Sequence, residues 1–197
     1  MARRVVIANP RSGAEVDEIA LRIIKKFQPK VLDKPAPFEI ELFFECSLES
    51  ISGVNSDYKE LPSGIYGYTD SDAMESVISS ELMDDPFQIR FCRSTMAHEV
   101  GHVLIHVPEF RCQKALLRSI HDKRHVSLRL YREVDVPVFK NPEWQAWRFA
   151  GALLMPAPSI KAAISDGLSV GGLSTLFQVN PAFVRTRLRA LKIECLT

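Results

Sequence analysis

Apolar residues at three- and four-residue steps predict helices in the first half of the chain. In residues 12–27 the pattern begins with Ser12 and Glu15, which have the spacing of a capping box, and it ends before Pro29. A second pattern runs from about Ile89 to His106, where we expect Pro108 to stop the helix. Residues 112–120 have a weaker helical pattern.

The second half of the chain predicts further helices. Asn141 followed by Pro142 is typical of a helix start, and the apolar pattern continues through Leu154 before two prolines end it. Asn180 and Pro181 begin another helix in the same way. The helices expected here cover residues 143–154, 159–164, 173–177 and 181–191.

Alternation of apolar and polar residues predicts a small sheet between these helices. The expected strands are residues 38–44, 64–69 and 76–80. Residues 1–10 are expected to be extended, 47–63 a loop with a helical turn, and 125–131 a strand or extended loop. The pattern indicates an α+β fold, mainly helical, with a small, mostly antiparallel sheet and a C-terminal helical tail.

Length and composition favour one domain. The chain has 197 residues, of which 46% are hydrophobic, and this suits a single core. We divide it into an N-terminal helix and first strand (1–63), a central core (64–158) and C-terminal helices resembling a helix-turn-helix (159–197). The formal net charge of +1 does not favour nucleic acid or an anionic membrane as a partner.

Targeting signals and cysteine motifs are weak. The first ten residues are too short for a signal-peptide core, and no apolar run approaches about 20 residues, so we expect a cytoplasmic protein without a membrane partner. The four cysteines form no CxxC pair, and we interpret them as buried, reduced thiols.

The segment His98 to His102 has the pattern His-Glu-x-x-His, which carries the main chemical signal. Histidines four positions apart lie on one face of a helix, so both imidazoles can bind one metal ion. The intervening Glu99 can then act on a water molecule at that ion. This arrangement predicts a zinc hydrolase.

Catalytic zinc generally takes three protein ligands, so a third must lie elsewhere. The spacing His-Glu-x-x-His-x-x-Gly-x-x-His is excluded, because position 105 is Ile105 and position 108 is Pro108. The remaining histidines are His106, His121 and His125. Against them stands Glu143 in the first turn of a predicted helix, since a Glu from a second helix is the third ligand in the thermolysin-like class.

Two sequence blocks resemble the ImmA/IrrE-type metallopeptidases. The first runs from Thr95 to His106, and the second from Glu143 to Pro156 with the ending Leu-Leu-Met-Pro. The tail at 173–191 fits the same family, so the resemblance covers about residues 64–193. One position departs from the pattern, because relatives often have Asn where this chain has Trp147, and this affects hydrogen bonding around the metal ligands.

The resemblance implies a zinc-dependent endopeptidase with a zincin-like fold, in which residues 64–158 form the zinc-site core. His98, His102 and Glu143 would bind Zn²⁺, and Glu99 would be the catalytic acid and base. Members of this family typically cleave a transcriptional repressor in the cytoplasm and so relieve repression of stress or mobile-element genes. The implied partner is therefore a protein substrate, a helix-turn-helix repressor or an antitoxin-like regulator.

Other polar residues are candidates for supporting roles. His106 lies one further turn along the helix from His102 and is a candidate for orienting a ligand, or alternatively a half-buried histidine in the core. Tyr131, His121 and His125 lie between the two blocks and are candidates for stabilising an oxyanion. Ordinary packing is the alternative for each.

The tail supports an alternative function. Arg185, Arg187 and Arg189 on the last predicted helix resemble a basic recognition helix, which would bind DNA. Arginines two positions apart point in different directions, however, and the net charge is low, so we favour helices that complete the core. The alternative to a peptidase is thus a regulatory protein that retains a metal site but acts by binding DNA or a partner.

Overall fold

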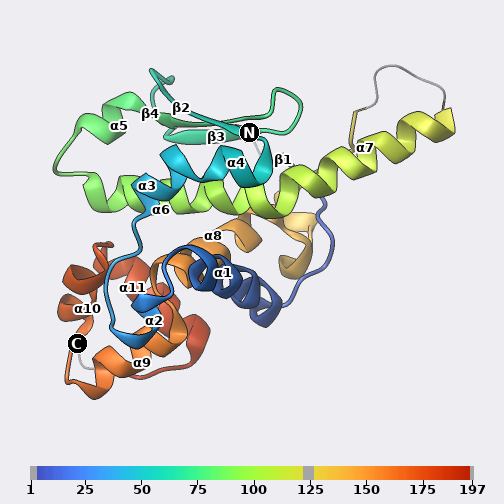
Figure 1. Cartoon of the computed structure of the whole chain (residues 1–197). Helices are drawn as coiled ribbons and strands as arrows, with labels where there is room; N and C mark the ends of the chain where they lie inside the picture. Colours follow the sequence, from blue (N-terminus) through green and yellow to red (C-terminus); the bar gives the residue numbers. More distant parts are fainter. Residues whose placement is uncertain (1–3, 122–126, 196–197) are drawn as a thin grey trace.

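Helices α6 (Ile89–Gly101) and α8 (Pro142–Leu154) form the centre of the fold (Figure 1). The computed structural model describes residues 4–121 and 127–195. The two helices approach closely at Gly101, where an added Cβ would lie 3.1 Å from the Cα atom of Ala146. Glycine permits this close backbone approach. The contact places the start of α8 beside the end of α6.

Helix α6 continues through a π-helical segment, η1 (His102–His106), into α7 (Val107–His121), so that one long helical rod crosses the molecule (Figure 1). The prediction that Pro108 ends the helix was therefore wrong. In the π turn the Val107 N–H bonds to the His102 carbonyl, five residues earlier. This wider turn gives room for the proline ring, which clashes with a regular α-helix. The weaker helical pattern at 112–120 belongs to α7.

Helix α1 (Gly13–Phe27) packs on α8 and confirms the first predicted helix. Its capping box is present: the Ser12 hydroxyl accepts from the Glu15 N–H at 3.2 Å, and the Ser12 N–H donates to the Glu15 carboxylate at 2.6 Å. Val16, Ala20 and Ile24 are buried against the core. A short helix, α2 (Lys30–Asp33), follows.

The predicted strand at 38–44 was wrong, because these residues lead into helix α3 (Ile40–Cys46). Ile40, Phe43 and Phe44 are buried, and their spacing suits one face of a helix as well as part of a strand. A run of this length is ambiguous from periodicity alone. Helix α4 (Leu48–Ser52) follows and confirms the helical turn expected in 47–63.

The main sheet has the strand order β2-β4-β3, with β2 (Asn55–Lys59), β3 (Gly67–Asp70) and β4 (Glu75–Ser79). Strand β4 runs antiparallel to β3 and parallel to β2. The strands expected at 64–69 and 76–80 correspond to β3 and β4. Strand β2 was missed, because its polar sequence lacks apolar alternation. The sheet lies along α6, and Val77 and Ile78 of β4 are buried.

A second sheet pairs β1 (Arg4–Val6) with β5 (Leu130–Arg132) antiparallel. The extended segments predicted at 1–10 and 125–131 are thus confirmed for the residues that the structure describes. The remaining elements are α5 (Ser80–Asp84), η2 (Glu133–Asp135), η3 (Val138–Lys140), α9 (Ala157–Ser165), α10 (Val170–Phe177) and α11 (Pro181–Leu191).

An ion cluster joins the N-terminal helix to the C-terminal tail. Asp17 of α1 accepts two hydrogen bonds of 2.7 Å from Arg148 of α8. Arg187 of α11 contacts both oxygens of the same carboxylate at 3.0 Å. The Arg187 side chain is buried, and its Nε also donates to the Met155 carbonyl. The cluster fixes α11 against the core.

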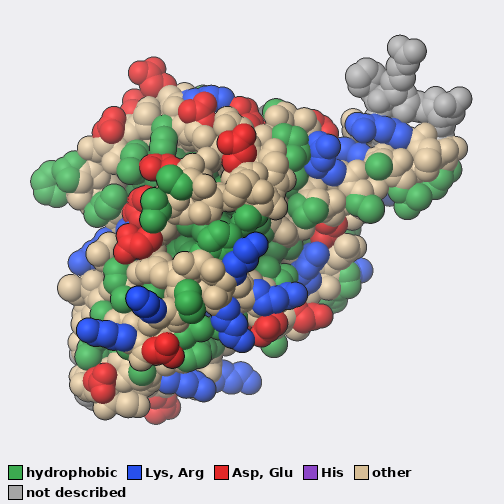
Figure 2. Space-filling view, in the orientation of Figure 1, with side chains coloured by type: hydrophobic (Ala, Val, Ile, Leu, Met, Phe, Trp, Pro, Cys, Tyr) green, Lys and Arg blue, Asp and Glu red, His purple; other side chains and the backbone are tan. Residues whose placement is uncertain are grey.

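The fold is mainly helical α+β, as predicted. Basic and acidic side chains are intermixed on the face shown in Figure 2. Among the described residues, no helix combines the length and the apolar character needed to cross a membrane. Cysteines 46, 92, 112 and 195 are free, as expected, but only Cys92 is fully buried, while Cys46 and Cys112 are exposed.

Candidate metal centre

The two histidines of the His-Glu-x-x-His segment converge, as their spacing predicts. His98 lies in α6 and His102 follows one turn later, at the start of η1. Their Nε2 atoms lie 3.1 Å apart. His98 is buried and His102 is half-buried, so the pair lies just below the protein surface.

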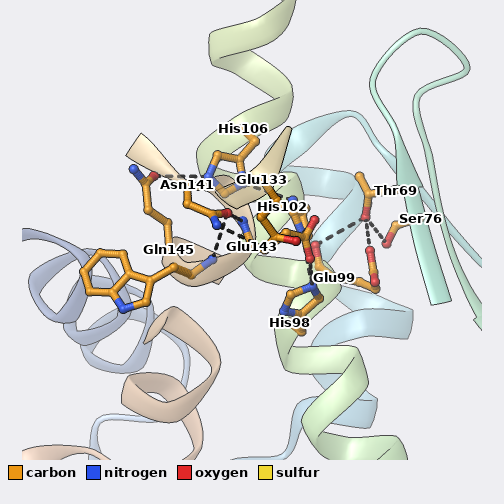
Figure 3. A network of polar contacts seen from close by, with 11 residues as sticks. Thr69, Ser76, His98, Glu99, His102, His106, Glu133, Asn141, Glu143 and Gln145 are labelled. Atoms are coloured by element: carbon orange, nitrogen blue, oxygen red, sulfur yellow. Dashed lines mark hydrogen bonds and ion pairs between the residues drawn. The ribbon is translucent and has the colours of Figure 1, made fainter. Parts of the chain in front are cut away.

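Glu143 is brought to this pair by the start of α8. Asn141 caps the helix, and its side-chain oxygen accepts from the Glu143 N–H at 2.9 Å. The carboxylate oxygens of Glu143 lie 3.4 Å from His98 Nε2 and 3.5 Å from His102 Nε2. Figure 3 shows the three side chains meeting between the two helices. Among the described residues, these three form a group able to hold one metal ion.

The spacing of the group fits a small divalent cation. A tetrahedral zinc ion with ligands at about 2.0–2.1 Å separates those ligands from one another by about 3.3 Å. The three separations measured between His98, His102 and Glu143 are 3.1, 3.4 and 3.5 Å. Two imidazole nitrogens and one carboxylate are also a donor set that suits zinc. The residues present therefore fit the ion that the sequence predicts.

The protonation states also favour a cation. Burial lowers the pKa of His98, which keeps its imidazole neutral. Burial of the Glu143 carboxyl raises its pKa, but hydrogen bonds with His102 and His98 outweigh burial and hold the pKa below its ordinary value. Neutral imidazoles and an ionised carboxylate are the forms that bind a metal ion.

Glu99 is held by the edge strand of the main sheet. The Thr69 hydroxyl of β3 donates to Glu99 Oε2 at 2.7 Å and lies 3.1 Å from the Ser76 hydroxyl (Figure 3). At Gly67 an added Cβ would lie 3.1 Å from Glu99 Cγ, so strand and helix touch closely there. The sequence did not single out Thr69 or Gly67, because strand periodicity alone does not tell which residue faces α6.

His106 contacts the metal group through His102. Their Nδ1 atoms lie 3.1 Å apart, and His106 Nε2 lies 3.1 Å from Gln145 Oε1. Burial, together with the nearby His102, holds the pKa of His106 well below its ordinary value, so this imidazole is neutral. His106 therefore lies in contact with His102, the predicted metal ligand that it is a candidate to orient.

Gln145 fixes the direction of these hydrogen bonds. Its amide nitrogen donates to the Asn9 and Phe139 carbonyls, both at 2.9 Å, which leaves its oxygen to accept. His106 Nε2 must then carry a proton, and His106 Nδ1 accepts from the Nδ1–H of His102. With this tautomer, the Nε2 lone pair of His102 would point at a metal ion held between His102 and Glu143. Sequence analysis missed Gln145, because its role depends on contacts more than 100 residues away in the chain.

The surroundings of His98 differ from those of His102. His98 Nδ1 is buried and has no hydrogen-bond partner among the residues that the structure describes. The indole of Trp147 instead lies against the imidazole, with ring centroids 4.2 Å apart and an interplanar angle of 38°. Metal-binding histidines generally donate this second N–H to an acceptor. At His98, Trp147 supplies a ring contact instead of a hydrogen-bond acceptor.

The other candidates lie elsewhere or outside the described residues. Tyr131 is in β5 opposite Val5, and the Arg129 guanidinium carbon lies 5.0 Å from its ring centroid. No hydrogen bond or ring contact within 4–121 and 127–195 joins Tyr131 to the metal group. His125 and the side chain of His121 are outside the described part of the chain.

The fold is similar to that of a solved structure. It is described as a Mycobacterium tuberculosis transcriptional regulator, and it matches with a TM-score of 0.57 and 17% sequence identity. The match covers 89% of this chain and 46% of that chain, so this chain spans less than half of that structure's length. At this identity the similarity shows the fold alone. No protein-family model and no curated protein matches the chain.

Proposed function

We propose that this chain is a zinc-dependent endopeptidase that cleaves a regulatory protein, either a transcriptional repressor or an antitoxin-like regulator. The observation that carries the proposal is the convergence of His98, His102 and Glu143 at separations of 3.1 to 3.5 Å, with Glu99 between the two histidines in the chain. The resemblance of the two sequence blocks to ImmA/IrrE-type metallopeptidases supports the same reaction.

The chain would supply three metal ligands and a general base. A bound zinc ion would polarise the scissile carbonyl and make a neighbouring water molecule more acidic. Glu99 takes the proton from that water and passes it to the leaving amine. The Thr69 hydroxyl holds Glu99 Oε2 at 2.7 Å, which leaves Oε1 to accept the proton.

The edge of the main sheet offers a place for the substrate backbone. Strand β3 pairs with β4 on one side, and it is the last strand of its sheet in the order β2-β4-β3. An extended peptide can add to such an edge by main-chain hydrogen bonds. Because Thr69 of β3 contacts Glu99, a peptide added along β3 lies next to the catalytic carboxylate.

The regulatory role rests on two similarities. Members of the ImmA/IrrE-type family, which the two sequence blocks resemble, typically cleave repressors. The solved structure of similar fold is described as a transcriptional regulator. We therefore expect the substrate to be encoded near this chain's gene. The test is a cleavage assay on a purified neighbouring repressor with the zinc-loaded protein. Cleavage by the parent and by Glu81→Gln, which alters a carboxylate on α5, and none by Glu99→Gln would support the proposal.

A second candidate function is DNA or partner binding through α11. Arg185 and Arg189 are exposed and lie one turn apart on this helix, whereas Arg187 is buried in the ion cluster with Asp17. Glu99→Gln separates the two functions. A peptidase retains zinc and loses regulation with this change, while a binding protein regulates as before and instead loses regulation with Arg185→Ala combined with Arg189→Ala.

A further inference from the structure

A cavity of about 300 Å³ lies between α8 and α11, beside the metal centre. Its aromatic walls are Trp144, Trp147 and Phe183, and Gly151 leaves one side open by having no side chain. Trp147 is 39% exposed, although its ring also packs against His98. The volume suits one bulky side chain together with part of its neighbour.

Trp147 joins this cavity to the metal centre. Its ring lies 4.2 Å from the ring of His98 on one side and 5.9 Å from the ring of Phe183 on the other. A group in the cavity is therefore separated from a metal ligand by a single indole ring. A peptide whose backbone lies at the metal centre can reach the cavity with a side chain close to the bond being cut.

The lining of the cavity also carries excess positive charge. Arg148 and Arg187 both line the cavity, and both contact the single carboxylate of Asp17. Two guanidinium groups against one carboxylate leave a formal charge of +1. Arginine always stays charged, so this excess favours a carboxylate from a ligand. The cavity thus combines an apolar surface with a preference for negative charge.

We propose that this cavity is the specificity pocket of the site and takes a bulky apolar side chain, preferably aromatic, that is followed by an acidic residue in the substrate. The inference rests on the proposed peptidase function and adds the class of sequence that is recognised. Trp147, Phe183 and Gly151 shape the pocket, and the Arg148–Arg187–Asp17 cluster selects the acidic neighbour.

Intrinsic fluorescence reports directly on this pocket. The chain has two tryptophans, Trp144 and Trp147, and both line it. The zinc-loaded Glu99→Gln protein is titrated with three blocked tetrapeptides, acetyl-Ala-Phe-Asp-Ala-amide and the same peptide with Ala for Phe or with Lys for Asp. Burying a phenylalanine side chain corresponds to tighter binding by about ten- to a hundred-fold. We expect the peptide with Phe to bind more tightly than the peptide with Ala by this factor. Of the two peptides that contain Phe, the one with Lys in place of Asp should bind more weakly.

Two variants that fill the pocket test its location. Gly151→Leu places a side chain inside it, because a Cβ added at this position would lie 3.4 Å from Arg187 Cδ. Thr186→Phe narrows the rim from an exposed position on α11 and does not disturb buried packing. Each should reduce the preference for Phe over Ala to about two-fold or less. Arg185→Ala, on α11 but outside the lining, is the matched control and should keep the preference.

The outcomes separate this inference from the proposed function. Equal binding of the Phe and Ala peptides, or a preference that survives both Gly151→Leu and Thr186→Phe, would overturn the pocket assignment. A self-association that Thr186→Phe abolishes would assign the cavity to a second copy of the chain and also overturn it. Selective binding of the Phe peptide without cleavage by the parent protein would contradict the peptidase and leave the selectivity of the pocket standing.

Discussion

The Nδ1 atoms of His102 and His106 lie 3.1 Å apart, and this contact determines which nitrogen of His102 faces Glu143. Gln145 accepts from His106 on the far side, so the direction of donation runs from His102 to His106 to Gln145. His106, one turn beyond His102, is thus placed where it could orient His102 as a carboxylate or carbonyl does in many metal sites.

We predict that His106→Phe weakens metal binding by about 10- to 100-fold, the usual cost of removing an outer partner of a metal ligand. Phenylalanine retains the ring and its contact with Phe110 but cannot accept from His102. Zinc affinity measured by competition with a chromophoric chelator checks this. Gln113→Ala, which removes a contact with Glu109 only, serves as control and should bind zinc like the parent. Unchanged affinity in His106→Phe would show that the contact does not orient His102.

We predict that Trp147→Asn tightens metal binding, by up to about ten-fold on the scale of outer-partner effects. The amide oxygen offers an acceptor to His98 Nδ1, which is buried and has no partner among the described residues. Trp147→Phe retains a ring against His98 without an acceptor and should leave the affinity near that of the parent. An equal gain in both variants would attribute the effect to steric relief instead.

We predict that Glu143→Ala empties the metal site at low free zinc, with a larger loss of affinity than the 10- to 100-fold expected for an outer partner. The carboxylate would supply the third ligand, since its Oε2 lies 3.4 Å from His98 Nε2 and its Oε1 lies 3.5 Å from His102 Nε2. Metal analysis of protein purified without added zinc should give about one zinc per chain for the parent and almost none for the variant. Glu133→Gln, which changes the acid that accepts from Asn141, is the control. Parent-like zinc content in Glu143→Ala would exclude Glu143 as a ligand.

We predict that iodoacetamide at pH 8 labels Cys46 and Cys112 and leaves Cys92 unmodified. Burial raises the pKa of Cys92 to about 11, so its thiol stays protonated at pH 8 and is also inaccessible. Mass spectrometry of tryptic peptides measures the modification of each cysteine. After denaturation in guanidinium chloride, Cys92 should react like the others. Labelling of Cys92 in the native protein at the rate of Cys46 would contradict its burial.

We predict that Asp17→Ala lowers the free energy of unfolding by about 3 kcal/mol, because it leaves the buried Arg187 guanidinium without its carboxylate. Chemical denaturation followed by circular dichroism measures the change. Glu18→Ala, at the next and exposed position of α1, should alter stability by less than about 0.5 kcal/mol. A similar, small effect of both changes would mean that the cluster contributes nothing net.

Local signals in the sequence were sufficient for the helices that carry the metal group. The spacing of His98 and His102 fixes their common face, and Asn141 with Pro142 marks the start of the helix that presents Glu143. Both signals act within one turn of helix, so they do not depend on the rest of the fold.

Signals that depend on tertiary contacts were missed. The segment 38–44 has apolar spacings compatible with helix and strand, and packing against α6 selected the helix. The local preference of Pro108 predicted the end of the helix. The π turn before Pro108 instead lets the helix continue. Thr69 and Gln145 could not be assigned, because each acts on a residue 30 or more positions away.

The ion cluster around Asp17 also limits how the tail can act. Because Arg187 of α11 and Arg148 of α8 share one carboxylate from the first long helix, α11 is not a detachable module. Any partner that lifted α11 away would expose a buried guanidinium and dismantle one wall of the cavity beside Trp147. A ligand that occupied the cavity would therefore also stabilise the contact between the first long helix and α11.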